Sequence, residues 1–234
     1  MTDFVLVHGA GSAPSYWHLV APELRRQGHQ VLTPELPCDD ETAGLGDYGD
    51  AIADSIGNRR DVVLVAQSFG AFSAPLVCDR VAVQQIILVA PMIPLPGESA
   101  GDWWAATGWE KARRYHADDT GQPVVAMDDI ENLFLHDVPP ESAIRAQTRR
   151  QASKPFTEPW PLLQWPDVAT AVIACSQDRL FPLPFMRRVA RERLGVAASA
   201  LESGHLPALA RPVKLVEHML AILPFANRTC AAPA

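Results

Sequence analysis

An apolar run that stops abruptly at a serine is the feature of this sequence that most constrains its fold. The aliphatic run Val62–Ala66 is followed by Gln67 and Ser68. Small residues stand two positions before the serine, at Ala66, and two positions after it, at Gly70. A sharp strand-to-helix turn needs such residues, because its backbone is strained and comes close to its neighbours. The stretch therefore predicts a buried strand that turns into a helix, with the hydroxyl of Ser68 at the apex.

The rest of the chain alternates short apolar runs with helical patterns. Such alternation is typical of a mostly parallel sheet with helices on both faces, which is the α/β class that we expect. The expected strands are Phe4–Val7, Gln30–Thr33, Val62–Ala66, Gln85–Ala90, Thr170–Cys175 and Ala198–Leu201. The expected helices are Tyr16–Gln27, Tyr48–Asn58, Ala71–Asp79, Pro184–Arg193 and Val213–Leu223. Because no change in composition divides the chain, residues 1–234 are expected to form a single domain.

The region 91–166 interrupts this alternation. It separates two expected strands by far more than a normal crossover, and its helical patterns are short, Glu141–Gln151 being the clearest. Five of the six tryptophans lie in it, namely Trp103, Trp104, Trp109, Trp160 and Trp165. A long, aromatic-rich insertion predicts an ordered lid over an apolar pocket. The alternative for each ring is that it only attaches the insertion to the main domain.

Composition narrows the possible partners and compartments. The formal net charge of -7 argues against a nucleic-acid interface, which needs clustered basic residues. No apolar run is long enough to span a bilayer, and Met1–Asp3 leads into the first strand without a signal segment, so we expect a cytoplasmic protein. The scattered cysteines lack the spacing of zinc or redox sites and are expected to be reduced thiols. They are Cys38, Cys78, Cys175 and Cys230.

Two further residues follow expected strands where acyl transfer by a serine would use them. That chemistry needs a nucleophile, a general base and an acid that orients the base. Asp178 lies in the loop after Thr170–Cys175, and His205 follows the last expected strand, in a loop whose small residues let the ring project. Taken singly, Asp178 would more often be an exposed or capping carboxylate, and His205 a surface imidazole. The order Ser68, Asp178, His205 is nevertheless the one that the α/β-hydrolase architecture imposes, so we expect a catalytic triad.

The tetrahedral intermediate of such a reaction needs two backbone N–H donors for its oxyanion. The amide of Phe69, at the start of the helix after Ser68, is one candidate. The loop after the first strand offers Ala10 as the second, with His8 bracing that loop. A nucleotide-binding loop is the weaker interpretation of these glycines, because Pro14 stands where a third glycine would be needed.

Two segments carry a resemblance to a known family. Phe4-Val-Leu-Val-His-Gly-Ala10, with Trp17 downstream, resembles the opening of the plant methylesterase and hydroxynitrile lyase family within the α/β-hydrolase superfamily. Ser203-Gly-His-Leu-Pro-Ala-Leu-Ala-Arg-Pro212 resembles the closing segment of that family. The resemblance implies an α/β-hydrolase fold with an inserted lid. It also implies the same triad and oxyanion donors, namely Ser68, Asp178, His205, Ala10 and Phe69.

Two positions separate the branches of that family. The cyanogenic lyases resembling this chain carry a threonine in the oxyanion loop and a lysine directly after the catalytic histidine, where this sequence has Gly9 and Leu206. We therefore expect a serine hydrolase of small, fairly apolar carboxylic esters that needs no metal or cofactor. Lactonase and thioesterase activities stay open because they use the same machinery. A ligand-binding receptor is the non-enzymatic alternative, and a monomer and a homodimer are both compatible with the sequence.

Overall fold

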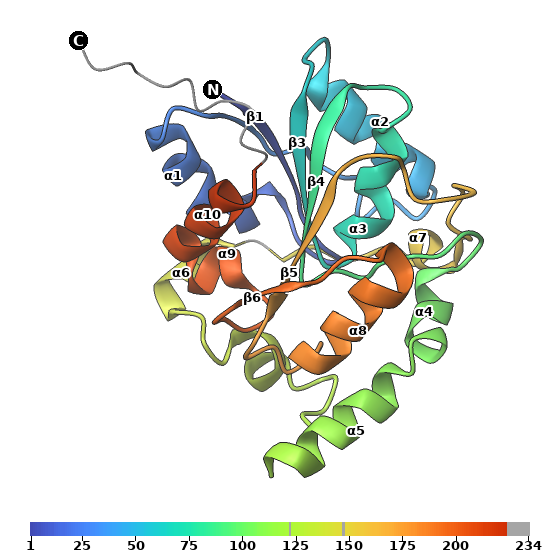
Figure 1. The fold of residues 1–234 in the computed structure, drawn as a ribbon, viewed down its shortest axis with the longest axis vertical. Coiled ribbons are helices and arrows are strands. Elements are labelled where there is room, and N and C mark those ends of the chain that lie inside the picture. The colour runs from blue at the N-terminus through green and yellow to red at the C-terminus, as the bar shows by residue number, and fades with distance from the viewer. Residues whose placement is uncertain (122, 147, 224–234) are drawn as a thin grey trace.

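The sheet consists of parallel strands throughout. In a computed structural model of the chain, which describes residues 1–121, 123–146 and 148–223, six strands pair in the order β2-β1-β3-β4-β5-β6 (Figure 1). Their bounds are β1 Asp3–Val7, β2 Gln30–Leu32, β3 Val62–Gln67, β4 Val83–Val89, β5 Thr170–Cys175 and β6 Ser199–Leu201. Each overlaps the strand expected from the sequence. The predicted α/β class is therefore confirmed.

Helices cover both faces of this sheet (Figure 1). One face carries α1 (Val20–Arg26), α9 (Pro207–Ala210) and α10 (Pro212–Ala221), and the other carries α2 (Leu45–Ile56), α3 (Gly70–Ser73) and α8 (Leu183–Leu194). Alternate side chains of a strand point to opposite faces. In β1, Phe4 and Leu6 accordingly enter one apolar cluster, while Val5 and Val7 enter the other.

Two expected helices are each divided into two shorter ones, and a proline lies near each division. The pattern Tyr16–Gln27 divides into the 3-10 helix η1 (Pro14–Trp17) and α1. Pro22 lies in the first turn of α1, where its missing N–H costs nothing, so the regular helix begins at Val20. The pattern Ala71–Asp79 likewise becomes α3 followed by the 3-10 helix η2 (Ala74–Val77), because Pro75 cannot continue the helical hydrogen bonds.

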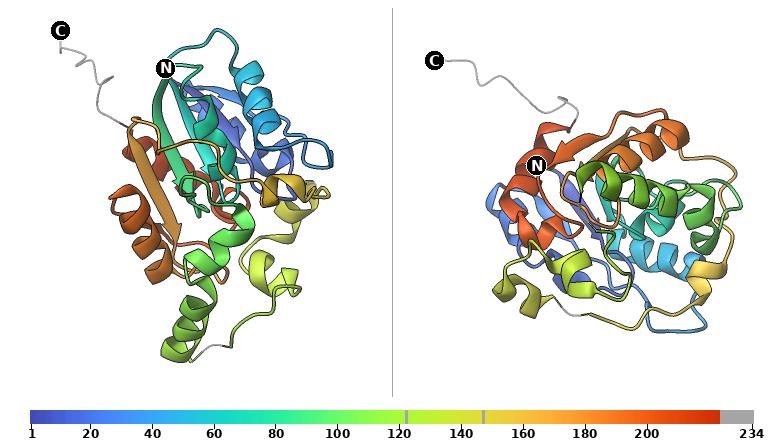
Figure 2. Two further views of the ribbon diagram at one scale, coloured as in Figure 1. Left: turned by 90° about the vertical axis from the view of Figure 1, so that its right-hand side faces the viewer. Right: turned by 90° about the horizontal axis from the view of Figure 1, so that it is seen from below.

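The β4–β5 insertion, residues 90–169, lies at the carboxyl end of the sheet (green to yellow in Figures 1 and 2). Its helices are α4 Ala100–Ala106, α5 Trp109–Thr120, the π-helix η3 Glu131–Leu135, α6 Pro140–Arg145 and α7 Lys154–Thr157. The loops that follow β3, β5 and β6 open toward the same end, because all the strands run in one direction. The insertion therefore lies beside every residue predicted to do chemistry.

The sequence was wrong about two helices of the insertion. Only short helices were expected, yet α5 has 12 residues, bounded by Gly108 and Gly121 in left-handed conformation. Its one buried residue is Arg113, so it has no apolar stripe that periodicity could detect. The pattern Glu141–Gln151 instead stops at Arg145, because the backbone beyond it bonds elsewhere. The amide of Arg149 donates to the carbonyl of Gly11 at 2.8 Å.

Tryptophan side chains attach the insertion to the rest of the molecule. The indole N–H of Trp160 donates to the Phe72 carbonyl at 3.0 Å, and that of Trp109 donates to the Leu180 carbonyl at 2.7 Å. Trp103 is fully buried and donates to the Ile93 carbonyl at 2.8 Å. Of the two interpretations offered by the sequence, attachment accounts for the contacts of Trp160 and Trp109, while the bond of Trp103 to Ile93 lies within the insertion.

The remaining sequence-level expectations concern thiols and membranes. Cys38, Cys78 and Cys175 are free thiols, whereas Cys230 lies outside the described residues. In the part of the chain that the structure describes, no helix combines the length and the apolar character needed to cross a bilayer.

Candidate active site

Ser68 occupies the turn between β3 and α3 with a backbone φ of 51°. A residue with a side chain rarely adopts this left-handed conformation, so the turn is strained and must be held from outside. Two hydrogen bonds at the end of β4 hold it. The Ser68 amide donates to the Val89 carbonyl at 3.0 Å, and the Met92 amide donates to the Ser68 carbonyl at 3.0 Å. The predicted apex is thus fixed by a neighbouring strand.

Glycines beside this turn allow three segments to approach one another. A Cβ atom at Gly70 would lie 2.9 Å from the His8 carbonyl oxygen and 3.2 Å from that of Val7. A Cβ atom at Gly9 would lie 2.3 Å from Oε1 of Gln67 and 3.1 Å from Cβ of Ser68. Contacts below 3.0 Å are essentially never seen at a real Cβ atom. At Gly70 the neighbour is backbone, so β1 and the turn at Ser68 pack this closely only because residue 70 is glycine, whereas at Gly9 the nearest atom is the end of the Gln67 side chain.

The three residues of the predicted triad meet in one line of hydrogen bonds. His205 Nε2 lies 3.1 Å from Ser68 Oγ, and His205 Nδ1 lies 2.7 Å from Asp178 Oδ2. The other carboxylate oxygen of Asp178 accepts the amides of Leu180 and Phe181 at 2.8 and 2.9 Å. A carboxylate held in this way accepts a hydrogen bond from the Nδ1–H of His205, which keeps the proton on Nδ1 and leaves a lone pair on Nε2 facing the hydroxyl. Such a line can move a proton from serine to imidazole.

Backbone hydrogen bonds between the loops hold Ser68, His205 and Asp178 in place relative to one another. The amide of Ser176 donates to the Leu201 carbonyl at 2.8 Å, and the amide of Gln177 donates to the Ser203 carbonyl at 3.0 Å. The loop before Asp178 is therefore bonded directly to the segment before His205. From the turn at Ser68, the side chain of Gln67 donates to the His205 carbonyl at 3.2 Å. All three loops are thus linked by hydrogen bonds.

Aromatic rings surround the imidazole of His205. The Phe181 ring meets it edge-on with centroids 5.1 Å apart, and the Phe134 ring of the insertion does so at 5.4 Å. His205 and Asp178 are both buried, while Ser68 is partly exposed. The hydroxyl is thus the accessible end of the line, and its surroundings are largely apolar.

The two predicted oxyanion donors lie in the loops that follow β3 and β1. Phe69 directly precedes α3, and Ala10 lies in the exposed turn after β1. Within the described residues, neither amide N–H donates to an acceptor. The loop of Ala10 is held from the insertion, because the Gly11 amide donates to the side chain of Gln151 at 3.1 Å. The roles of Ala10 and Phe69 remain predictions.

His8 is buried beneath this loop, with Nδ1 2.9 Å from the Gly9 carbonyl. This contact fits the bracing role expected for it. Its Nε2 is buried and has no hydrogen-bond partner among the described residues. Burial lowers the pKa of His8 to about 4. The imidazole is therefore neutral at physiological pH and adds no cation to the site.

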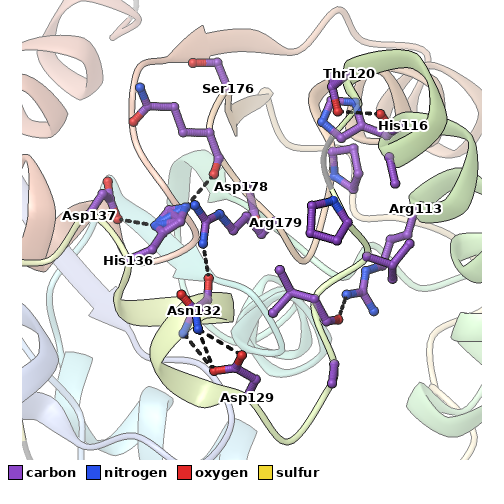
Figure 3. A pocket seen from close by; sticks show the side chains of 17 residues that line it. Arg113, His116, Thr120, Asp129, Asn132, His136, Asp137, Ser176, Asp178 and Arg179 are labelled. Atoms are coloured by element: carbon purple, nitrogen blue, oxygen red, sulfur yellow. Dashed lines mark hydrogen bonds and ion pairs between the residues drawn. The ribbon is translucent and has the colours of Figure 1, made fainter.

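A cavity of about 870 Å³ lies between the loop of Asp178 and the insertion (Figure 3). Polar side chains line much of it, including Arg113 and His116 of α5 and Arg179 beside Asp178. Arg113 is buried, donates to the Val125 carbonyl and lies 4.7 Å over the Trp109 ring. None of the described lining residues is a tryptophan, so this cavity is not the apolar pocket expected from the sequence.

Three residues that support the site were not found from the sequence. They are Gln67, which bonds the His205 backbone, Gln151, which bonds the loop of Ala10, and Asp137, which bonds the loop of His205. Gln67 could have been suspected, since it lies inside the motif around Ser68. No local pattern marks the other two, because their partners are distant in sequence. In the described part of the chain, no three His, Cys, Asp or Glu side chains are grouped as metal ligands.

Comparison with known proteins gives matches that span most of the chain. The family described as "Alpha/beta hydrolase family" matches residues 4–218. Methylesterase 2 of Arabidopsis thaliana is 24% identical, over 94% of this chain and 95% of that protein. The pyrethroid hydrolase of Sphingobium wenxiniae is 25% identical, over 97% of this chain and 88% of that protein.

Solved structures share the fold. An extracellular alpha/beta-hydrolase from a Paenibacillus species, described as a structural and functional homologue of tobacco salicylic acid binding protein 2, superposes with a TM-score of 0.74. It is 22% identical, over 94% of this chain and 98% of that one. A pyrethroid hydrolase from Sphingobium faniae gives a TM-score of 0.73 at 23% identity, over 94% and 96% of the two chains.

Proposed function

Because the chain belongs to the alpha/beta hydrolase family, we propose that it hydrolyses small, fairly apolar carboxylic esters through an acyl-enzyme on Ser68. The observation that carries this proposal is the line of hydrogen bonds from Asp178 through His205 to Ser68, at 2.7 and 3.1 Å. Similarity to a methylesterase and a pyrethroid hydrolase supports an ester as the substrate.

The reaction proceeds in two halves. Nε2 of His205 takes the proton of Ser68 Oγ, and the oxygen attacks the ester carbonyl. The amides of Ala10 and Phe69 bind the oxyanion of the tetrahedral intermediate. As the carbon–oxygen bond to the alcohol breaks, His205 returns the proton to the leaving alcohol. Water then attacks the acyl-enzyme in the same way and releases the carboxylic acid and Ser68, while Asp178 keeps the imidazole oriented throughout.

The β4–β5 insertion completes the proposal as a lid on a single domain of residues 1–234. Its residues 91–166 carry Phe134, whose ring meets His205, and Phe156, whose ring stacks on Phe69 with centroids 4.2 Å apart. Apolar rings against His205 and Phe69 favour an apolar acyl or alcohol group. The chain is expected to act in the cytoplasm on a small molecule.

Incubation with a fluorophosphonate probe and with p-nitrophenyl esters of graded length tests this function. Wild type is expected to be labelled and to turn over the shorter esters, and Ser68→Ala and His205→Ala are each expected to lower kcat by at least about three orders of magnitude. Ser73→Ala is the matched control, because this buried serine bonds only the Gly70 carbonyl and does not touch His205. Wild-type protein without labelling or turnover that depends on Ser68 would refute the hydrolase.

The lyase alternative fits this site less well. The Cβ of a threonine at position 9 would lie 2.3 Å from Gln67 Oε1, so the Gln67 side chain would have to move, and this chain has Leu206 where the lyases have a lysine. Cyanide release from mandelonitrile, assayed beside the esters, is therefore expected to be absent. Lactone and thioester substrates belong in the same panel, because the proposed proton transfers apply to them unchanged. Tight ligand binding without any turnover would instead favour a receptor.

A further inference from the structure

We propose that Asp137, which the β4–β5 insertion supplies, is a positioning residue that holds the loop of His205 in place for catalysis. The inference rests on the proposed function. Asp137 Oδ2 accepts two hydrogen bonds from that loop, one from the Gly204 amide at 2.8 Å and one from the Ser203 hydroxyl at 3.2 Å. Both donors directly precede His205 in the chain. The carboxylate thus fixes the backbone from which the imidazole projects.

The glycine before His205 is explained by this contact. A Cβ atom at Gly204 would lie 2.5 Å from Asp137 Oδ1 and 2.6 Å from Cε1 of His136. With any larger residue, either the side chains of Asp137 and His136 or the loop itself would have to move, and the contact would be lost. Gly204 therefore has two effects. It lets the imidazole of His205 project, and it lets the carboxylate of Asp137 reach the backbone of the loop.

His136 extends the contact to the loop of Asp178. Its Nε2 lies 3.0 Å from the Gln177 carbonyl, one residue before Asp178, and because a carbonyl only accepts, Nε2 must carry the proton. Figure 3 shows His136 and Asp137 side by side on the cavity wall. Since the Gln177 amide also bonds the Ser203 carbonyl at 3.0 Å, the insertion and both catalytic loops form one closed set of hydrogen bonds. A shift of the insertion would therefore move Asp178 and His205 together.

The second oxygen of Asp137 predicts which substitution is tolerated. Asp137 Oδ1 and His136 Nδ1 are buried 3.4 Å apart, and neither has a hydrogen-bond partner in the described part of the chain. Burial lowers the pKa of His136, so the neutral imidazole, with its proton on Nε2, presents a lone pair at Nδ1. An asparagine at 137 could keep both bonds to the loop through its carbonyl oxygen and donate its N–H to that lone pair. Hydrogen bonding, rather than charge, is therefore the property that the site requires.

The test compares kcat and KM for a p-nitrophenyl ester in four proteins. Asp137→Ala is expected to lower kcat by about 10- to 100-fold with KM changed by less than about threefold, because misplacement of a catalytic group slows the chemical step more than binding. Asp137→Asn is expected to retain kcat within about threefold of wild type. The control is Asp129→Ala, a carboxylate of the same insertion and cavity that bonds Asn132 and neither catalytic loop. Its kinetics should match wild type.

A spectroscopic measurement follows the position of His205 without substrate. The far-downfield proton resonance of a histidine that donates to a carboxylate should be present in wild type, Asp137→Asn and Asp129→Ala, and lost or moved in Asp137→Ala. If Asp137→Ala does not fold, Ser203→Ala removes one of the two donors and is expected to lower kcat a few-fold. The inference would be overturned if Asp137→Ala, or Ser203→Ala where Asp137→Ala does not fold, kept the kcat of wild type. It would also be overturned if Asp137→Asn were as slow as Asp137→Ala. If the wild-type protein shows no turnover, the proposed hydrolase function is refuted, and the proton resonance of His205 would still test the positioning role of Asp137.

Discussion

The carboxyl edge of the sheet and the β4–β5 insertion are built by different rules. At the sheet edge, Ser68, Asp178 and His205 each follow a strand, and backbone hydrogen bonds between parallel neighbours place them. The insertion has no strand among its described residues, and indole N–H groups such as those of Trp109 and Trp160 attach it to distant carbonyls. The edge is thus defined by local sequence and strand order, whereas the insertion is defined by single long-range contacts.

This difference separates the expected effects of mutations. Substitutions at the sheet edge should change the chemistry or its response to pH, because the polar groups there have fixed partners. Substitutions of attachment residues in the insertion should mainly change stability. Asp137, His136 and Gln151 join the two regions, since they belong to the insertion and bond the loops of catalytic or oxyanion candidates.

The largest effect is expected from Asp178→Asn. The amide oxygen would keep the bonds from the Leu180 and Phe181 amides, but its N–H₂ would face Nδ1 of His205 and force the proton onto Nε2. With no lone pair toward Ser68, kcat should fall by about 10³- to 10⁴-fold at nearly unchanged stability. Steady-state kinetics and a thermal melt measure this. Asp167→Asn, at an exposed position before β5, is the control, and equal activity of the two variants would contradict a role for Asp178.

An intermediate effect is expected at His8, in the response of stability to acid. Its pKa is lowered by burial to about 4 in the folded protein, from 6.5 in the unfolded chain, so the unfolded state binds more protons between these values. The contribution of His8 to the free energy of unfolding is complete above pH 6.5. It decreases by about 3 kcal/mol as the pH falls toward 4. Urea unfolding at pH 7.5 and pH 4 should show a smaller acid-induced loss in His8→Asn than in wild type. Identical losses would show that His8 is not held neutral.

The smallest effect is expected from Trp160→Phe in the insertion. The change leaves the Phe72 carbonyl without its indole donor and should lower the free energy of unfolding by about 1–2 kcal/mol. Because the sheet edge is untouched, kcat/KM should stay within about threefold of wild type. Leu163→Ala, at a side chain 93% exposed, serves as the control and should alter stability by less than about 0.5 kcal/mol. A large loss of activity in Trp160→Phe would break the proposed division between the regions.

The sequence predicted the sheet edge well for a physical reason. A buried parallel strand is a short aliphatic run, so Val62–Gln67 and Thr170–Cys175 are visible locally, and parallel order then brings their following loops to one end. The helices were predicted less accurately, since Pro22 and Pro75 lie in stretches whose apolar periodicity predicts one continuous helix.

The insertion was predicted less well because its contacts are not local. α5 has a single buried residue, Arg113, and so lacks an apolar stripe. The bonds from Arg149 to Gly11 and from Gly204 to Asp137 join positions far apart in the chain, and no motif marks either partner. The catalytic roles of the triad and of the oxyanion donors stay predictions for the experiments above.

The concentration of tryptophan in the insertion makes this part of the molecule optically visible. Five of the six indoles lie there, and the sixth, Trp17, is fully buried in the cluster beneath β1. Intrinsic emission of the unlabelled protein therefore reports chiefly on residues 103–165. A ligand that settles against Trp104 or Trp109, or a displacement of these rings, would alter the emission, and stopped-flow fluorescence could time that event against the release of alcohol.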